Sequence, residues 1–392
     1  MKSSALRWSL VFAVSGSLAL AGCSSAEDDD PYHPPANLAG ASGASVAGAA
    51  GSMAGAPSGG SGTAGAPSAG SSGSAGAAGS SAGAAGSAGS GGGSAGTGGA
   101  PPFGVIKCSP TGDGDGKHDL TTTASPPEWT LQNGATAGTV TPKGDFVSPN
   151  YTPGHFSYWI YTSSNYVKGS PAIFLLFGDG NQFMTDFHVA TVLDNLTATH
   201  VLPATVALFV DPPTDGTNGI NEQVRQQAYD PPTDKYTTFL FNELLPGIIY
   251  DKYSVSRDPE AWAEVGYSAS GGQGWKVLWN RPDAIHKFVG ISSSFGAAIT
   301  YNVDWVSVVN MAPAHPIRAS LLASTKDLSD NRGDWLTINT NMANALNAKG
   351  NKWRFEVAQA ACNTAQCGHY PPVDGERDLP NALRWTFQGC TF

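Results

Sequence analysis

The sequence is short of basic residues and of long hydrophobic runs, and each shortage excludes a class of protein. Lys and Arg number 21 against 31 Asp and Glu, which gives a formal net charge of −10 at pH 7. That acidic balance argues against a nucleic-acid partner. The apolar run at residues 10–20 is too short for a comfortable transmembrane helix, which needs about 20 residues.

That apolar run is typical of a signal peptide instead. Lys2 and Arg7 precede it, and the segment ends Leu-Ala-Gly directly before Cys23. This arrangement resembles a bacterial lipobox, so we expect residues 1–22 to be a lipoprotein signal peptide and Cys23 to carry lipid. The residue after Cys23 is a serine, which in such lipoproteins favours the outer membrane. An ordinary secretory signal followed by an incidental cysteine is the alternative.

The next segment, residues 23–100, has the composition of a linker. Residues 39–100 are almost entirely Gly, Ala and Ser, and such a chain buries too little apolar area to offset the entropy of ordering it. A strict triplet period with proline is missing, which excludes a collagen-like fibre. We therefore expect a disordered tether, followed by one large domain over residues 101–392.

The expected domain holds four cysteines: Cys108, Cys362, Cys367 and Cys390. An even number in an exported chain predicts disulfides, and four cysteines allow three connectivities. We expect Cys362–Cys367, which closes a small loop, and Cys108–Cys390, which ties the two ends of the domain together. Four free thiols are the alternative.

Short apolar runs alternate with amphipathic segments along this domain. The runs predict strands at 156–162, 172–177, 205–210, 262–267, 287–291, 317–323 and 352–358. The amphipathic segments predict helices at 186–199, 236–245, 271–279, 335–348 and 380–387. Strands that alternate with helices indicate an α/β fold with a doubly wound, mostly parallel sheet.

The strongest chemical signal is a small-residue turn between a predicted strand and a predicted helix. It contains Gly266, Ser268 and Ser270, followed by two further glycines. A nucleophile elbow needs small residues two positions before and after its serine, because the strand-to-helix turn is very tight. Ser270 stands where glycine is usual. The turn predicts Ser268 as nucleophile and the N–H of Ala269 as an oxyanion donor; a turn without chemistry is the alternative.

An elbow serine needs a histidine base and an acid that orients it, and this fold presents them in the order serine, acid, histidine. His315 precedes a predicted strand and would lie at the wrong end of the sheet, whereas His369 follows the last predicted strand. We therefore expect His369 as the base. Asp327 and Asp330 both follow the strand at which the acid belongs, and the residues alone leave this choice open.

A second oxyanion donor is expected from the loop after an early central strand. Gly178, Asp179 and Gly180 follow such a strand, and the glycines allow the backbone to approach an ester carbonyl closely. A simple turn is the alternative.

Several stretches together resemble the enterochelin (enterobactin) esterase-like branch of an esterase family in the α/β-hydrolase superfamily. They are 157–161, 177–180, 192–196, 229–230, 242–246, 266–272, 280–284, 327–328, 333–335 and 379–385. The resemblance implies a Ser-Asp-His triad, places the nucleophile on Ser268 and favours Asp327 as the acid. It also supports Arg225 and Tyr229 as residues that line the substrate cleft; a surface loop is the alternative for them. Trp275 is the further aromatic residue that we assign to the substrate, although core packing is an alternative for it.

The histidine is where the sequence departs from that family. The position of the family's catalytic histidine falls on Cys362 when it is counted forward from the last predicted strand. It falls close to His369 when it is counted back from residues 379–385. A loop inserted between Cys362 and Cys367 reconciles the two alignments.

The sequence thus predicts a lipid-anchored serine esterase with a small-molecule ester substrate, such as a siderophore or acylated-sugar ester. The expected reaction requires no metal or cofactor, and the sequence leaves the oligomeric state open. A catalytically degenerate surface binding lipoprotein is the main alternative, and a peptidase or acyltransferase on the same fold is another.

Overall fold

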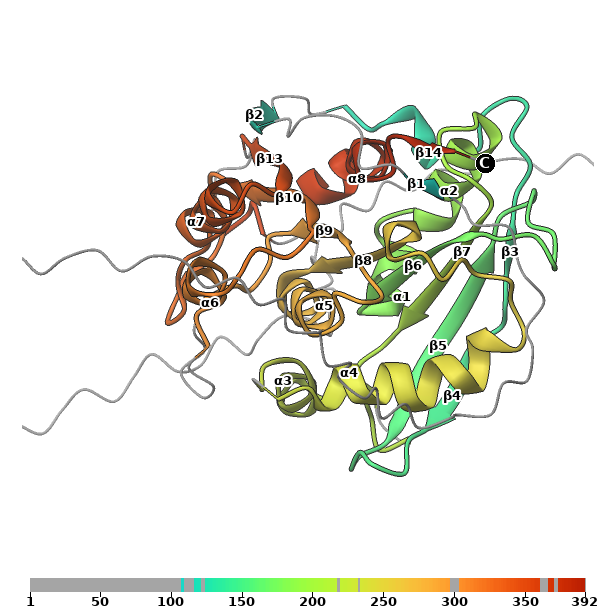
Figure 1. Ribbon diagram of the computed structural model, residues 1–392, viewed down its shortest axis with the longest axis horizontal. Helices are drawn as coiled ribbons and strands as arrows, with labels where there is room; N and C mark the ends of the chain where they lie inside the picture. The colour runs from blue at the N-terminus through green and yellow to red at the C-terminus, as the bar shows by residue number, and fades with distance from the viewer. Residues whose placement is uncertain are drawn as a thin grey trace, which may run out of the picture. The chain divides into compact units, whose positions relative to one another are not determined.

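The computed structural model describes residues 107–108, 116–120, 124–216, 219–231, 233–296, 303–359, 366–369 and 373–391. The expected signal peptide, the linker, Cys23 and Cys362 lie outside these residues. The described chain is built around one large sheet with helices on both faces (Figure 1). The predicted α/β fold class is therefore confirmed.

Ten strands of the described residues form the main sheet in the order β2-β13-β10-β9-β8-β6-β7-β5-β3, with β4 paired to β5. The strands from β2 to β7 in this order run parallel, whereas β5 is antiparallel to β7, β3 and β4. Their bounds are β2 Gly116–Leu120, β3 Thr139–Val140, β4 Gly144–Val147, β5 His155–Thr162, β6 Ile173–Gly178, β7 Thr205–Val210, β8 Trp262–Tyr267, β9 Lys287–Ile291, β10 Arg318–Ser324 and β13 Lys352–Ala358.

Two groups of helices cover the two faces of this sheet (Figure 1). One group is α1 Gly180–Thr185, α2 Val189–Ala198 and α8 Val373–Thr386. The other is α3 Glu222–Tyr229, α4 Lys235–Phe239, α5 Ser268–Asn280, α6 Trp305–Met311 and α7 Trp335–Ala348. Helix α4 continues through π-helical turns at Leu240–Leu244 and Pro246–Tyr250. The faces switch where the chain passes from β7 across β6 to β8, as in doubly wound sheets.

The central strands hold the core because both of their faces are covered. All residues of β7, β8, β9 and β10 are buried, in agreement with the continuous apolar runs of the sequence. All seven predicted strands are present within a residue or two, and the helix predicted at 335–348 has these bounds. Helices α1, α3 and α6 were not predicted; α5 begins at Ser268 rather than at residue 271, and α8 begins at Val373 rather than at residue 380.

Two short strand pairs lie beside the main sheet: β1 Lys107–Cys108 with β14 Cys390–Thr391, and β11 Ser329–Asp330 with β12 Gly333–Asp334. In the first pair, Cys108 and Cys390 are direct antiparallel partners, so the backbone brings these two positions together. The pairings Cys108–Cys390 and Cys362–Cys367 stay predictions.

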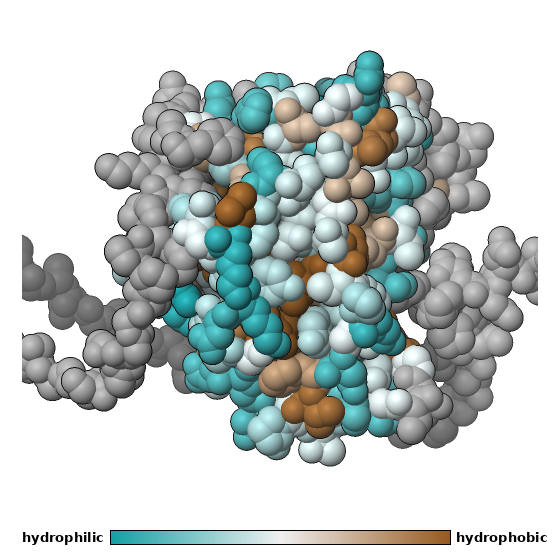
Figure 2. Space-filling model, turned by 90° about the vertical axis from the view of Figure 1, so that its right-hand side faces the viewer, coloured by the Kyte–Doolittle hydropathy of each residue, from teal (hydrophilic) through white to brown (hydrophobic). Residues whose placement is uncertain are grey.

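The side face in Figure 2 shows hydrophobic residues in small, separate patches among hydrophilic ones, a pattern that is ordinary for a protein surface. In the part of the chain that is described, no helix combines the length and apolar character needed to cross a membrane.

Candidate active site

Ser268 lies at the corner between β8 and α5, at the carboxyl end of the parallel strands. Its backbone has φ 56°, a left-handed conformation that is unusual for a residue with a side chain and marks a strained functional turn. The residue is 7% exposed, so its hydroxyl lies in a largely enclosed place at the N-terminus of the 13-residue helix α5. This is the geometry of a nucleophile elbow.

The small residues of the elbow are required by close backbone contacts. A Cβ on Gly266 would lie 2.6 Å from Gly271 Cα and would also overlap the carbonyl of Ser270. Ser270, the departure from the usual glycine, fits because its Cβ faces Gly178, where an added Cβ would lie only 2.8 Å away. Its hydroxyl accepts a hydrogen bond from Tyr267 N (3.1 Å) and donates one to Tyr267 O (2.8 Å). Ser270 therefore stabilises the turn through these two hydrogen bonds.

His369 reaches the elbow serine from the loop after β13. Its Nε2 is 3.1 Å from Ser268 Oγ, and the whole residue is buried. The ring lies between Tyr267, with centroids 5.1 Å apart, and Trp335, with centroids 5.0 Å apart and planes at 79°. The Tyr267 hydroxyl also donates to the His369 carbonyl at 2.5 Å. These contacts fix both the backbone and the ring of His369.

Asp327 lies on the other side of the imidazole. Its Oδ1 is 2.6 Å from His369 Nδ1, and Ser292 Oγ donates to Oδ2 at 2.7 Å. The N–H groups of Leu328 (2.8 Å) and Ser324 (3.3 Å) also donate to this carboxylate. The structure thus brings Ser268, His369 and Asp327 into one hydrogen-bonded line.

The Asp330 carboxylate faces Arg332 and Trp335 rather than the His369 imidazole. It accepts two hydrogen bonds from the Arg332 guanidinium and one from Trp335 Nε1. His315 stacks on Trp279 with ring centroids 4.1 Å apart, and His286 is hydrogen-bonded to Glu260. Of these acids and histidines, Asp327 and His369 are the ones that form a hydrogen-bonded line with Ser268.

The loop between β6 and α1 lies beside the elbow, as the contact between Gly178 and Ser270 shows. Asp179 has φ 51° and is fully buried at its side chain, where it forms an ion pair with Arg225. The N–H of Asn181 donates to Asp211 Oδ1 at 2.8 Å. Burial raises the pKa of Asp211 to about 6, and the neighbouring Asp179 carboxylate adds to this increase. The loop is thus held by buried polar contacts.

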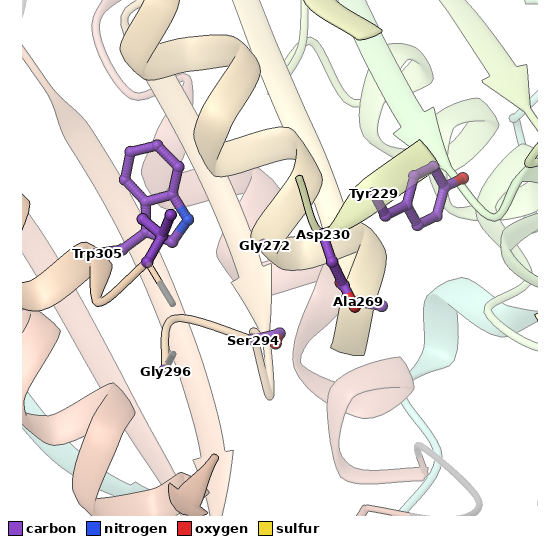
Figure 3. Close-up of a pocket in the computed structure, with 8 residues that line it drawn as sticks. Tyr229, Asp230, Ala269, Gly272, Ser294, Gly296 and Trp305 are labelled. Carbon is purple, nitrogen blue, oxygen red and sulfur yellow. The ribbon is translucent and has the colours of Figure 1, made fainter. Parts of the chain in front are cut away.

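A small cavity opens next to Ala269, the residue that follows the candidate nucleophile. Trp305 lines one side, Tyr229 and Asp230 line the other, and Gly272 and Ser294 lie between them (Figure 3). Tyr229 therefore lines this cavity, and its contact with substrate stays a prediction. The assignment of Trp275 to the substrate is wrong: this side chain is fully buried and packs edge-on against Phe288 and Phe295, because it faces the sheet side of α5.

Sequence reasoning missed several residues that support the site through contacts with its residues and helices. Ser292 binds the candidate acid, and Gly368 allows the histidine loop to pass close to Ser324, because an added Cβ would overlap the Ser324 hydroxyl. Lys276 is buried on α5 and donates to two carbonyls at the end of α3. A glycine directly before a candidate base is the only sequence signal we recognise among these. Within the described residues, no group of three or more metal-ligating side chains is present.

No family model matches the sequence, and no curated protein matches it. Solved structures, in contrast, match the fold. A ferulic acid esterase from the anaerobic fungus Anaeromyces mucronatus gives a TM-score of 0.53 at 16% identity, over 69% of this chain and 99% of that one. Another ferulic acid esterase gives 0.50 at 17% identity, over 64% and 99% of the two chains.

Enterobactin esterases match over a similar part of this chain. The ferric enterobactin esterase of Salmonella typhimurium gives a TM-score of 0.51 at 18% identity, over 67% of this chain and 61% of that one. The enterobactin esterase of Shigella flexneri gives 0.50 at 16% identity, over 67% and 62% of the two chains. The chain thus spans nearly all of the ferulic acid esterases but less than two thirds of the enterobactin esterases. It has the α/β-hydrolase fold that these esterases share.

Proposed function

We propose that the protein is a serine carboxylic-ester hydrolase that acts through an acyl-enzyme. The observation that carries this proposal is the line from Ser268 Oγ through His369 to Asp327, with separations of 3.1 Å and 2.6 Å. A nucleophile, a base within hydrogen-bonding reach and a group that orients the base are the parts that this chemistry needs.

In the proposed first step, Ser268 Oγ attacks the ester carbonyl carbon and its proton moves to His369 Nε2. Asp327 accepts the hydrogen bond from Nδ1–H, which keeps Nε2 free to take the proton and stabilises the imidazolium that forms. The tetrahedral intermediate then collapses, and the leaving alcohol takes the proton from Nε2. The acyl group remains on Ser268.

The second step returns the enzyme to its starting state. A water molecule attacks the acyl carbonyl and passes one proton to His369 Nε2, and the released Ser268 oxygen takes that proton back. In both steps the negative charge on the carbonyl oxygen is stabilised by the N–H of Ala269 and by one N–H of the loop at Gly178, Asp179 and Gly180. Losing one such donor typically costs about 100- to 1,000-fold in kcat.

The alternative of a non-catalytic binding protein depends on a missing base. The position of His369 beside Ser268 supports the enzyme instead, because a buried imidazole held on both sides suits proton transfer. A peptidase or acyltransferase would use the same groups. Product analysis with an amide substrate, or with an added acceptor alcohol, distinguishes these from an esterase.

The experiment uses the full chain and a short-chain aryl ester. Turnover is expected for the wild type, and Ser268→Ala is expected to abolish it while the protein still unfolds at a similar temperature. A fluorophosphonate probe should label Ser268, as read by mass spectrometry of the elbow peptide. Equal activity in both proteins, or a label on Ser270, would refute the assignment.

For the substrate, we propose an ester of the siderophore or acylated-sugar class. The solved structures that share the fold are named as ferulic acid and enterobactin esterases, and Trp305 and Tyr229 give the cavity beside Ala269 two aromatic side chains. Comparing kcat/KM for methyl ferulate, enterobactin and an acetylated sugar tests this proposal, and turnover of none of them would contradict it.

We also propose that lipid on Cys23 anchors the protein in the cell envelope, at the outer membrane. Metabolic labelling with a fatty acid, compared between the wild type and Cys23→Ala, tests the anchor, and membrane fractionation tests the location. An unlabelled wild-type protein would show that the signal is an ordinary secretory one.

A further inference from the structure

The loop that supplies the proposed second oxyanion donor is held by a buried ion pair. Both carboxylate oxygens of Asp179 accept hydrogen bonds from Arg225, at 3.0 Å from Nε and 2.6 Å from Nη2. The Asp179 side chain is fully buried and that of Arg225 is 10% exposed. A two-point contact of this kind fixes direction as well as distance, which matters because Asp179 is held at φ 51°.

Helix α3 makes a second contact with the same loop. The N–H of Asp179 donates to the hydroxyl of Tyr229 at 3.3 Å, and Tyr229 lies one turn after Arg225 on α3. In Figure 3 its ring points away from Trp305, on the far side of the cavity beside Ala269. One face of α3 therefore holds both the side chain and the backbone of Asp179.

The position of α3 is in turn fixed by the helix that begins with the nucleophile. Lys276 on α5 donates from Nζ to the carbonyls of Tyr229 (2.8 Å) and Pro231 (2.6 Å). The lysine is 2% exposed, and desolvation lowers its pKa to about 8. Burying an amino group is costly unless it is hydrogen-bonded, and these two carbonyls accept two of its three hydrogens at the C-terminal end of α3.

We infer that Arg225 and Lys276 are positioning residues, which act through α3 to set the distance between the two oxyanion donors. This inference rests on the proposed function. The chain of contacts runs from the Ser268 helix through Lys276 to α3, and from α3 through Arg225 and Tyr229 to Asp179. Oxyanion donors work because they are fixed before charge develops, and misplacement by about 1 Å costs up to about 100-fold.

The test compares Lys276→Met and Arg225→Met with Lys287→Met. Lys287 is an equally buried lysine, but it starts β9 at the opposite end of the strands and pairs with Glu260. We expect the first two variants to lower kcat about 10- to 100-fold with KM changed less than about threefold. Lys287→Met should keep kcat within about threefold, even if it lowers the melting temperature.

The readout specific to positioning is the affinity for a boronic acid that carries the acyl group of the substrate. Such an inhibitor forms a tetrahedral adduct on the serine and needs both donors, so its Ki should rise in parallel with the loss in kcat. A rise in KM with an unchanged Ki would overturn the inference, because Arg225 would then contact the substrate. Unchanged kcat in both variants would overturn it as well.

Tyr229→Phe and Arg225→Lys keep the test informative if the larger changes do not fold. The first removes only the acceptor of the Asp179 N–H, and the second keeps the charge but loses the two-point contact. Each should lower kcat about 3- to 10-fold, and the double variant should lose less than the product, because both changes release the same loop. Losses that multiply would contradict a shared role. A wild type without esterase activity would refute the proposed function, whereas active variants would refute only the positioning role.

Discussion

The replacement Asp327→Asn tests the order of the proposed triad most directly. Asp327 Oδ1 accepts from Leu328 N (2.8 Å) and faces His369 Nδ1 (2.6 Å), while Oδ2 faces Ser292 Oγ and Ser324 N. An amide has one oxygen and one NH2 group, so it cannot accept at both positions. Each orientation therefore places an NH2 group against a backbone N–H.

The two orientations weaken catalysis in different ways. With the NH2 group towards the imidazole, it donates to Nδ1, which leaves Nε2 protonated and unable to act as a base towards Ser268. With the amide oxygen towards the imidazole, the tautomer survives but the charge that stabilises the imidazolium is lost. In trypsin-like enzymes the same change lowers kcat about 10⁴-fold. We expect a loss of about 10³- to 10⁴-fold here, equivalent to about 4 to 5.5 kcal/mol in the activation free energy.

The assay is the kcat for an aryl ester, with Asp330→Asn as the matched control. Asp330 is a neighbouring carboxylate whose hydrogen bonds go to Arg332 and to Trp335 Nε1 rather than to the imidazole, so its variant should keep kcat within about threefold. Thermal unfolding of both variants separates loss of chemistry from loss of fold. A larger loss in Asp330→Asn, or more than a tenth of the kcat retained in Asp327→Asn, would refute the reasoning.

Three further predictions concern buried groups around the site. Asp211 has a folded-state pKa of about 6, above its usual 3.8, so its contribution to stability is lost as the pH rises through 6. Asp211→Asn should therefore increase the unfolding free energy at pH 7.5 by up to about 3 kcal/mol, measured by urea denaturation. An unchanged unfolding free energy would contradict this. Burial raises the pKa of Glu264 well above its usual range, so its contribution to stability is lost as the pH rises. Glu264→Gln should therefore make stability fall less with rising pH, as urea denaturation across a pH series would show, and a variant as sensitive to rising pH as the wild type would contradict this. Gly368→Ala should lower kcat at least 10-fold with little change in KM, because its Cβ would push the His369 loop away from Ser324, and full activity would show that the loop can shift freely.

Local sequence patterns were sufficient for the elements that repeat regularly. Helix α7 was predicted with its observed bounds, because its apolar residues follow a helical period, and the buried strands read as continuous apolar runs. Helix α3 was missed because its sequence, EQVRQQAY, has only a narrow apolar face. Its residues act by polar contacts with a loop distant in sequence, and no local pattern reports such contacts.

The substrate assignment of Trp275 failed for a related reason. An aromatic residue on the elbow helix suits either a cleft or a core, and the helical period alone does not tell which side of α5 faces the sheet. The fold decided it by placing Phe288 and Phe295 against the ring. Tyr229, in contrast, was assigned to the cleft by resemblance and lies at the cavity.

The sequence by itself determined the α/β class, the position of the elbow and the small set of acids and histidines that follow it. These follow from local rules: apolar periodicity, and the small side chains that a tight strand-to-helix turn demands. Only the tertiary structure brought Asp327, and not Asp330, within hydrogen-bonding distance of His369, placed His369 beside Ser268, and tied α3 to the loop at Asp179. Those outcomes depend on contacts between side chains that are 42 to 101 residues apart in the sequence. Over such separations the packing of the whole sheet, and not local conformation, sets the geometry.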